Sequence, residues 1–198
     1  MLFRSGASTF IDAITAEVHS VTLNGENLDV AKVADGQRIQ LDNLAAENEL
    51  TVVADMFYMN TGEGLHRFVD PVDNEVYLYS QFEVPDSRRV FAVFEQPSLK
   101  ATFKFTVTAP ENWKVVSNQA TPTPNAIGEG KATWAFEPTP VISSYITALI
   151  AGPYSEVRSE LTSSDGRIIP LGVFARASMT EFLDAEYIFE KTRQGFEF

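Results

Sequence analysis

The sequence predicts a mostly β domain of antiparallel strands, arranged as a sandwich or curved sheet, with a helix at its C-terminal end. Three observations lead to this fold class. Short stretches alternate apolar and polar residues with a period of two, as half-buried strands do. Turn signals rich in glycine, proline and asparagine recur between these stretches. The strongest helical pattern begins only at Ser178.

The strands are predicted one by one from this alternation. The clearest covers residues 102–108, whose apolar side chains alternate with threonine and lysine. Residues 50–56 are apolar on both faces, which predicts a central strand. A change of phase predicts a β-bulge near His19-Ser20, and Asn24-Gly25 predicts a hairpin turn. Further strands are expected near residues 37–44, 131–136, 144–151 and 168–175.

Two segments have helical signals. Residues 85–91 predict one or two turns with Asp86 as the cap, and Ser178 with Glu181 forms a capping box in front of an apolar face. The change of composition before Ser178 predicts a boundary between a β domain, residues 1–177, and the first helix of a following domain, residues 178–198. Because this last pattern stops unfinished, we expect the chain to be a fragment of a longer protein.

The composition excludes several classes of function. The 198 residues have a formal net charge of −12, and no Lys/Arg cluster stands out, which argues against nucleic acid and anionic membranes as partners. Without cysteine there is no disulfide framework, thiolate metal site or cysteine nucleophile. No apolar run is long enough to cross a membrane, and the charged start at Met1–Ser5 is too short for a signal peptide. A soluble, cytoplasmic protein is expected.

The chain gives little sign of being a complete enzyme. His19 and His66 are its two histidines and lie far apart, so no zinc helix motif is present. Neither a G-x-S-x-G elbow nor a phosphate-binding glycine motif occurs.

The stretch 75–84 contains the most informative pair of side chains. If it is a strand, Gln81 and Glu83 share a face, with Cα atoms about 6.6 Å apart. A carboxylate beside an amide suits a small cationic ligand, because one holds the charge and the other fixes the orientation. The alternative is a solvated strand face on which Glu83 pairs with Arg88 or Arg89.

Other interpretations remain open at this point. Glu83 and Asp86 form a possible carboxylate pair for glycoside hydrolysis, although sequence does not supply the distance that this chemistry needs. Trp113 and Trp134 suit either a sugar-stacking platform or the core of a sandwich. His66 is expected to be a structural loop histidine rather than a metal ligand.

Several blocks of the sequence resemble the N-terminal domain of the zinc aminopeptidase N family, in its bacterial form. The specific ones are Thr61–Phe68 (TGEGLHRF), Tyr77–Glu83 (YLYSQFE) and Asp86–Phe103, supported by Ala7–Ala13, Val21–Gly25 and Val115–Asn118. One departure is Glu95-Gln96-Pro97, since the family usually has aspartate at the first of these positions.

The resemblance implies a saddle-shaped, mostly antiparallel β domain that covers the active site of a thermolysin-like (gluzincin) catalytic domain. It implies that Glu83 helps to hold the free α-amine of a peptide substrate and that Gln81 lines the first side-chain subsite. The zinc ligands of H-E-x-x-H, a third glutamate ligand, the G-A-M-E-N loop and a tyrosine are expected beyond Phe198. Zinc is therefore expected in the longer protein and not in this chain, which alone should be inactive.

The leading hypothesis is thus the substrate-cleft domain of a metallo-aminopeptidase, whose partners are peptide N-termini and its own catalytic domain. The rival hypothesis is a stand-alone β-sandwich module that binds carbohydrate or protein.

Overall fold

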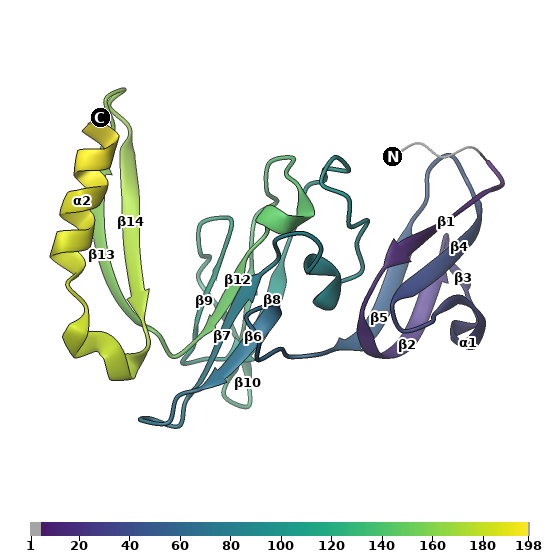
Figure 1. Cartoon of the computed structure of the whole chain (residues 1–198), viewed down its shortest axis with the longest axis horizontal. Coiled ribbons are helices and arrows are strands. Elements are labelled where there is room, and N and C mark those ends of the chain that lie inside the picture. The colour runs from purple at the N-terminus through teal and green to yellow at the C-terminus, as the bar shows by residue number, and fades with distance from the viewer. Residues whose placement is uncertain (1–4, 198) are drawn as a thin grey trace.

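The computed structural model describes residues 5–197, and its β-rich parts lie in a row along the long axis (Figure 1). The N-terminal part holds β1 to β5, the middle part holds β6 to β12, and the far end holds β13, β14 and helix α2. Every ladder between these strands is antiparallel. The predicted mostly β, antiparallel fold with a C-terminal helix is confirmed.

Two small sheets form the N-terminal part and enclose its core. One pairs β1 with β4, and the other has the order β3-β2-β5. Their bounds are β1 Ala7–Asp12, β2 Thr15–Leu23, β3 Glu26–Asn27, β4 Arg38–Leu44 and β5 Leu50–Met56, with the short helix α1 at Val30–Val33. The core consists of Ile11, Ala13, Val21, Leu23, Ile39, Leu41 and Leu44.

Strand β2 contains the predicted bulge. Its register against β5 shifts between Val18 and Ser20. The shift changes which alternate side chains face inward, so that Val18 packs on the core before it and Val21 is buried after it. At the end of β2, Asn24 and Gly25 have φ angles of 53° and 83°, the positive values that a tight hairpin turn needs at both positions. Both predictions are confirmed.

Strand β5 is not central, which corrects the prediction from its apolar faces. It spans the expected residues but lies at the edge of its sheet. Val53 is 48% exposed on the outer face, beside the exposed Asp55. A β-branched side chain suits an exposed strand face as well as a buried one, so alternation with valine did not distinguish the two.

The middle part is a sandwich of two sheets, with strand orders β6-β7-β12-β9 and β10-β11-β8. Both sheets contribute to one core, in which Trp134 is 2% exposed. The bounds are β6 Gly64–Val69, β7 Val76–Gln81, β8 Thr106–Pro110, β9 Lys114–Ser117, β10 Asn125–Gly128, β11 Lys131–Ala135 and β12 Leu149–Gly152, with 3-10 turns η1 at Ser87–Arg89 and η2 at Ser144–Ile146.

Two strands of this sandwich begin later than predicted. The expected strand at 102–108 joins a ladder only from Thr106, although the predicted alternation of exposed and half-buried side chains holds throughout. The expected strand at 144–151 starts as η2 and becomes β12 at Leu149. The Thr147 hydroxyl donates to the carbonyl three residues earlier, a local bond that competes with strand pairing.

The far end consists of the hairpin β13 (Ser155–Thr162) and β14 (Ile168–Ala175), the 3-10 segment η3 (Ala177–Phe182) and α2 (Ala185–Glu197). Helix α2 packs along the hairpin (Figure 1): Phe189 is 1% exposed, and Arg193 Nη2 donates to Ser159 Oγ at 3.0 Å. The boundary between residues 177 and 178 stays a prediction.

The predicted capping box is wrong. The cap of α2 is Asp184, whose carboxylate accepts from the Tyr187 backbone N–H at 3.0 Å. The Ser178 hydroxyl donates instead to Asp70, 2.6 Å away on the connection from β6 to β7. A hydroxyl that finds a buried carboxylate across the fold is not free to cap its own segment.

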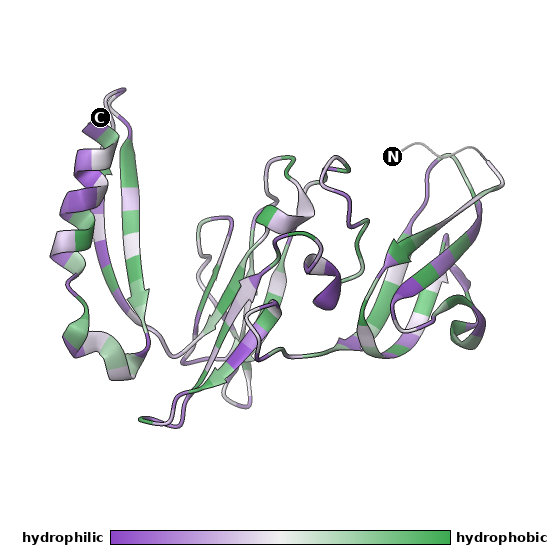
Figure 2. Ribbon diagram, in the orientation of Figure 1, coloured by the Kyte–Doolittle hydropathy of each residue, from purple (hydrophilic) through white to green (hydrophobic). Residues whose placement is uncertain are grey.

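Polar and apolar residues are mixed along the strands and along α2 (Figure 2). Within the described part of the chain, no helix is long and apolar enough to cross a membrane.

Candidate functional site

Gln81 and Glu83 lie together at the end of β7. Gln81 is the last residue of the strand, opposite Gly64 of β6, and Glu83 lies in the turn that follows. Both are exposed, while Phe82 between them is 2% exposed. The predicted strand therefore ends at Gln81, before residue 84, because the chain turns towards η1. Strand alternation no longer applies to Glu83, so a common face of Gln81 and Glu83 stays a prediction.

The two arginines considered as partners of Glu83 are paired with other carboxylates. Arg89 Nε lies 2.7 Å from the Asp86 carboxylate, and its Nη2 lies 3.4 Å from Glu63. Arg88 Nη1 lies 3.8 Å from Asp12. The Glu83 carboxylate has no hydrogen bond or ion pair with residues 5–197, so the alternative of a Glu83–arginine pair is not observed.

The glycosidase interpretation is disfavoured by the surroundings of Asp86. Asp86 is the predicted N-cap residue of η1, but its carboxylate makes no capping hydrogen bond and accepts instead from Arg89 Nε. The Asp86 carboxylate is thus occupied by the Arg89 guanidinium. Glu83 and Asp86 therefore have different environments, of which only that of Glu83 leaves the carboxylate available.

His66 is a structural residue, but it lies on strand β6 rather than in a loop. Its Nδ1 accepts a hydrogen bond from the Gly62 N–H at 3.0 Å, and its ring stacks on Tyr79 with centroids 4.7 Å apart. Tyr79 is two residues before Gln81 on the same face of β7. A stacked pair of rings thus lies next to the candidate site.

The turn after β7 is packed closely against its surroundings. Phe82 meets Phe91 edge to face, with ring centroids 5.9 Å apart. Gly64 has a φ of 58°, and a Cβ added there would lie 2.9 Å from the Arg89 Cβ. Glu95 accepts hydrogen bonds from the first two residues of η1, Ser87 and Arg88. This role of Glu95 was not predictable from the sequence, because its partners are defined only in three dimensions.

A hollow of about 430 Å³ opens beyond Tyr79, between the middle sandwich and the hairpin. Burial raises the pKa of Tyr154 in its wall to about 12, and the Tyr154 hydroxyl donates to the Leu78 carbonyl at 3.2 Å. Its lining residues are Phe68, Tyr77, Tyr79, Tyr154, Phe174, Ala175 and Arg176.

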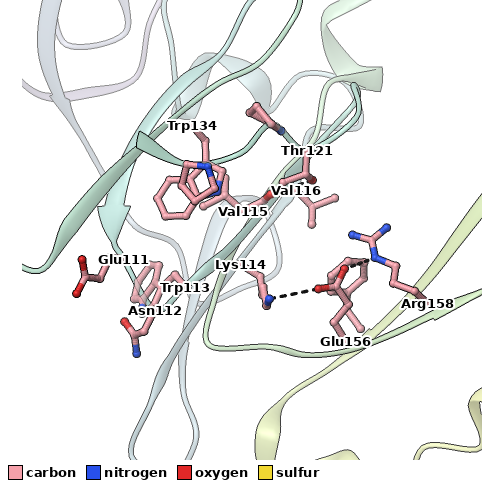
Figure 3. Close-up of a pocket in the computed structure, with 13 residues that line it drawn as sticks. Glu111, Asn112, Trp113, Lys114, Val115, Val116, Thr121, Trp134, Glu156 and Arg158 are labelled. Carbon is pink, nitrogen blue, oxygen red and sulfur yellow. Dashed lines mark hydrogen bonds and ion pairs between the residues drawn. The ribbon is translucent and has the colours of Figure 1, made fainter. Parts of the chain in front are cut away.

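A second hollow, of about 370 Å³, lies on the β9 side and contains the Lys114–Glu156–Arg158 ion pairs (Figure 3). Trp113 and Trp134 both line this hollow, but Trp113 is half-buried and Trp134 is only 2% exposed within the core, so Trp134 has no open ring face for a sugar. The two tryptophans therefore do not form the sugar-stacking platform considered from the sequence, and the core interpretation of Trp134 is confirmed.

One group of metal-ligating side chains occurs in the part of the chain that the structure describes. Glu17, His19 and Asp55 lie together on β2 and β5, all exposed, with His19 Nε2 3.2 Å from Asp55. One imidazole and two carboxylates on a strand face do not match the two histidines on one helix that the resemblance implies. The described residues of this chain therefore do not fit the zinc site that the resemblance implies.

Comparison with known proteins supports the resemblance. Residues 3–146 match the family described as the peptidase M1 N-terminal domain. The chain belongs to this family. The M1 domain is 59% identical over 193 residues to aminopeptidase N of Streptomyces lividans, covering 97% of the chain and 22% of that protein. It is 36% identical over 104 residues to aminopeptidase N of Acetobacter pasteurianus, covering 52% of the chain and 28% of that protein.

The fold of the M1 domain also matches a solved structure. Aminopeptidase A of Legionella pneumophila, crystallised in complex with aspartic acid, superposes with a TM-score of 0.77 over 89% of this chain and 21% of that one, at 18% identity. The M1 domain thus spans about a fifth of the length of such relatives.

Proposed function

We propose that this M1 domain forms one wall of the substrate cleft of a zinc-dependent aminopeptidase that releases N-terminal amino acids from peptides. The observation that supports this most directly is that Gln81 and Glu83 are both exposed where β7 ends, with Glu83 unpaired although two arginines lie nearby in sequence. An unpaired carboxylate above a rigid strand end is available to a cationic group of a ligand.

In this proposal Glu83 accepts hydrogen bonds from the α-ammonium of the substrate, and Gln81 contacts the first side chain. An internal peptide segment has no ammonium and would leave the carboxylate unpaired in a closed cleft, which disfavours its binding. Specificity for free N-termini follows from this difference.

The bond-breaking chemistry is assigned to the rest of the longer protein. The zinc there would supply an activated water, and the general base would come from the same domain. The residues of this chain bind and orient the substrate, and the chain alone is expected to be inactive. We also propose that residues 1–177 form the β domain, that residues 178–198 begin the catalytic domain, and that the protein is cytoplasmic.

The test compares free and blocked substrates. The full-length protein and this chain are each assayed with an aminoacyl chromogenic amide and with its N-acetylated form. We expect turnover only by the full-length protein and only of the free amine. Equal turnover of the acetylated amide would show that no carboxylate selects the ammonium, and turnover by this chain alone would place the catalytic groups within it.

A further inference from the structure

The turn that carries Glu83 is held from behind by the carboxylate of Glu95. Glu95 accepts a hydrogen bond from the Arg88 backbone N–H at 2.7 Å and from the Ser87 hydroxyl at 2.6 Å. The Ser144 hydroxyl, on η2, donates to the same carboxylate at 2.9 Å. Hydrogen bonds to an ionised acceptor are stronger than neutral ones, so one side chain fixes the residues that follow the turn.

The donors to Glu95 are enclosed. Ser87 is 0% exposed and Ser144 is 3% exposed. In the folded chain the carboxylate, rather than water, satisfies these two hydroxyls, and a buried hydroxyl without a partner would cost free energy. Ser87 accordingly has one favourable position, in contact with Glu95.

Glu95 is itself carried by a segment that is fixed on both sides. Before it, the Val93 backbone exchanges two hydrogen bonds with Asp12, each of 2.9 Å. After it, the Pro97 carbonyl accepts from the Ser143 hydroxyl at 2.7 Å. The carboxylate is thus anchored both to the N-terminal sheets and to the segment that leads into β12.

The Glu83 side chain makes no hydrogen bond or ion pair with the described residues. Its position therefore depends on the hydrogen bonds that hold the turn around it. The turn is tied at one end to β7 through Gln81 and at the other end to Glu95 through Ser87. We propose that Glu95 is a positioning residue that sets the place of Glu83 in the substrate cleft. This inference rests on the proposed function of Glu83.

The effect of losing Glu95 should appear in substrate binding. A displacement of about 1 Å in a binding group can cost a large factor in rate, so Glu95→Ala in the full-length protein should lower kcat/KM roughly tenfold, mostly through KM. Glu95→Gln should lower it less, because an amide keeps the shape and can still accept from the Arg88 N–H.

A double-mutant cycle with Glu83→Gln separates positioning from general damage. If Glu95 acts through Glu83, Glu95→Ala should cost less than about twofold once Glu83 is already changed. The same fold loss in both backgrounds would overturn the proposal and leave Glu95 with a structural role only. No kinetic effect of Glu83→Gln by itself would instead refute the proposed function, and the positioning role with it.

Two serines supply a matched control that does not depend on Glu95→Ala folding. Ser87→Ala and Ser144→Ala each remove one buried hydroxyl that donates to Glu95, but only Ser87 adjoins the turn. We expect both variants to lose similar thermal stability. Only Ser87→Ala should raise KM. Equal KM values for the two variants would overturn the proposal.

A local measurement on the 198-residue chain checks the structural step. Hydrogen exchange of the Arg88 amide, which donates to Glu95, should accelerate at least about tenfold in Glu95→Ala, while amides of β13 stay unchanged. Unchanged exchange at Arg88 would show that Glu95 does not hold the turn.

Discussion

Asp70 and Arg176 are 106 positions apart in the sequence and form an ion pair, with Arg176 Nη1 2.8 Å from the Asp70 carboxylate. Asp70 is 1% exposed and also accepts from the Ser178 hydroxyl at 2.6 Å. Nearby, the Tyr77 hydroxyl accepts from the Ala177 backbone N–H at 3.0 Å. Residues 176–178, which connect the hairpin to the C-terminal helices, are therefore held against the start of β7, the strand that ends in Gln81.

The first prediction concerns acid stability. The Ser178 hydroxyl, the Val72 N–H and Arg176 together hold the pKa of Asp70 below its usual range. A lowered folded-state pKa contributes stability at pH values above the unfolded value of about 3.9, and this contribution is lost as the pH falls from there through the folded-state pKa. We expect Asp70→Asn to lower the thermal midpoint at pH 7 and to flatten the decline of stability below about pH 4.

The control for this prediction is Glu137→Gln, which removes an exposed carboxylate elsewhere. Thermal unfolding by circular dichroism from pH 2 to pH 7 is the measurement. A decline below pH 4 that is as steep in Asp70→Asn as in the unchanged chain would show that Asp70 does not contribute to acid unfolding.

Local features of this fold were predictable from the sequence, and long-range partners were not. The bulge near His19 and the Asn24-Gly25 turn depend on neighbours in the chain. Tyr77 has the same strand phase as the exposed Tyr79 but is 1% exposed, because a distant segment covers it.

Long-range partners also explain the wrong predictions around the candidate site. Ser178 was expected to cap a helix, and its actual partner is Asp70, far away in sequence. Glu95 stood out only as a departure from the resemblance, although it accepts hydrogen bonds from two separate segments. A polar side chain with several possible partners has no local pattern that selects among them.

The second prediction concerns the C-terminal helix. A helix of this length is marginally stable in water by itself, but Phe189 of α2 is buried against the hairpin. Phe189→Ala removes that contact and should cost about 3 kcal/mol of local stability. Hydrogen exchange in α2 should then approach unprotected rates, while amides of β7 remain protected.

Tyr187→Ala is the matched control, because Tyr187 lies on the same helix and is 59% exposed. It should leave the exchange of α2 nearly unchanged. Fast exchange of α2 already in the unchanged chain would show that the hairpin does not stabilise this helix.

The third prediction concerns metal. Glu17, His19 and Asp55 are exposed and offer a single imidazole, so zinc should bind weakly and be lost on dialysis. Metal analysis after dialysis should give well under one equivalent. Any weak zinc binding in a titration should disappear in His19→Ala. It should persist in His66→Ala, because the His66 ring already contacts the Gly62 N–H and the Tyr79 ring and does not bind the metal. One retained equivalent would mean that this chain has a true zinc site.

The last prediction concerns Glu83 in the full-length protein. A charge-assisted hydrogen bond to the substrate ammonium is worth about 1.5–3 kcal/mol. Glu83→Gln keeps the shape and removes the charge, so kcat/KM for aminoacyl amides should fall roughly ten- to several-hundred-fold, at ~1.4 kcal/mol per decade. Much of the loss should appear in KM if the contact already exists in the bound substrate.

The stability of this variant distinguishes a binding residue from a surface ion pair. Glu83 has no ionic partner among the described residues, so Glu83→Gln should change the free energy of unfolding by less than ~0.5 kcal/mol. If Glu83 were part of a surface ion pair, Glu83→Gln would instead lower the free energy of unfolding by up to ~1 kcal/mol and leave kcat/KM unchanged. Because Glu137→Gln makes the same chemical change at an exposed site, it sets the baseline for both measurements. Kinetics within twofold of that baseline for Glu83→Gln would remove Glu83 from the substrate site.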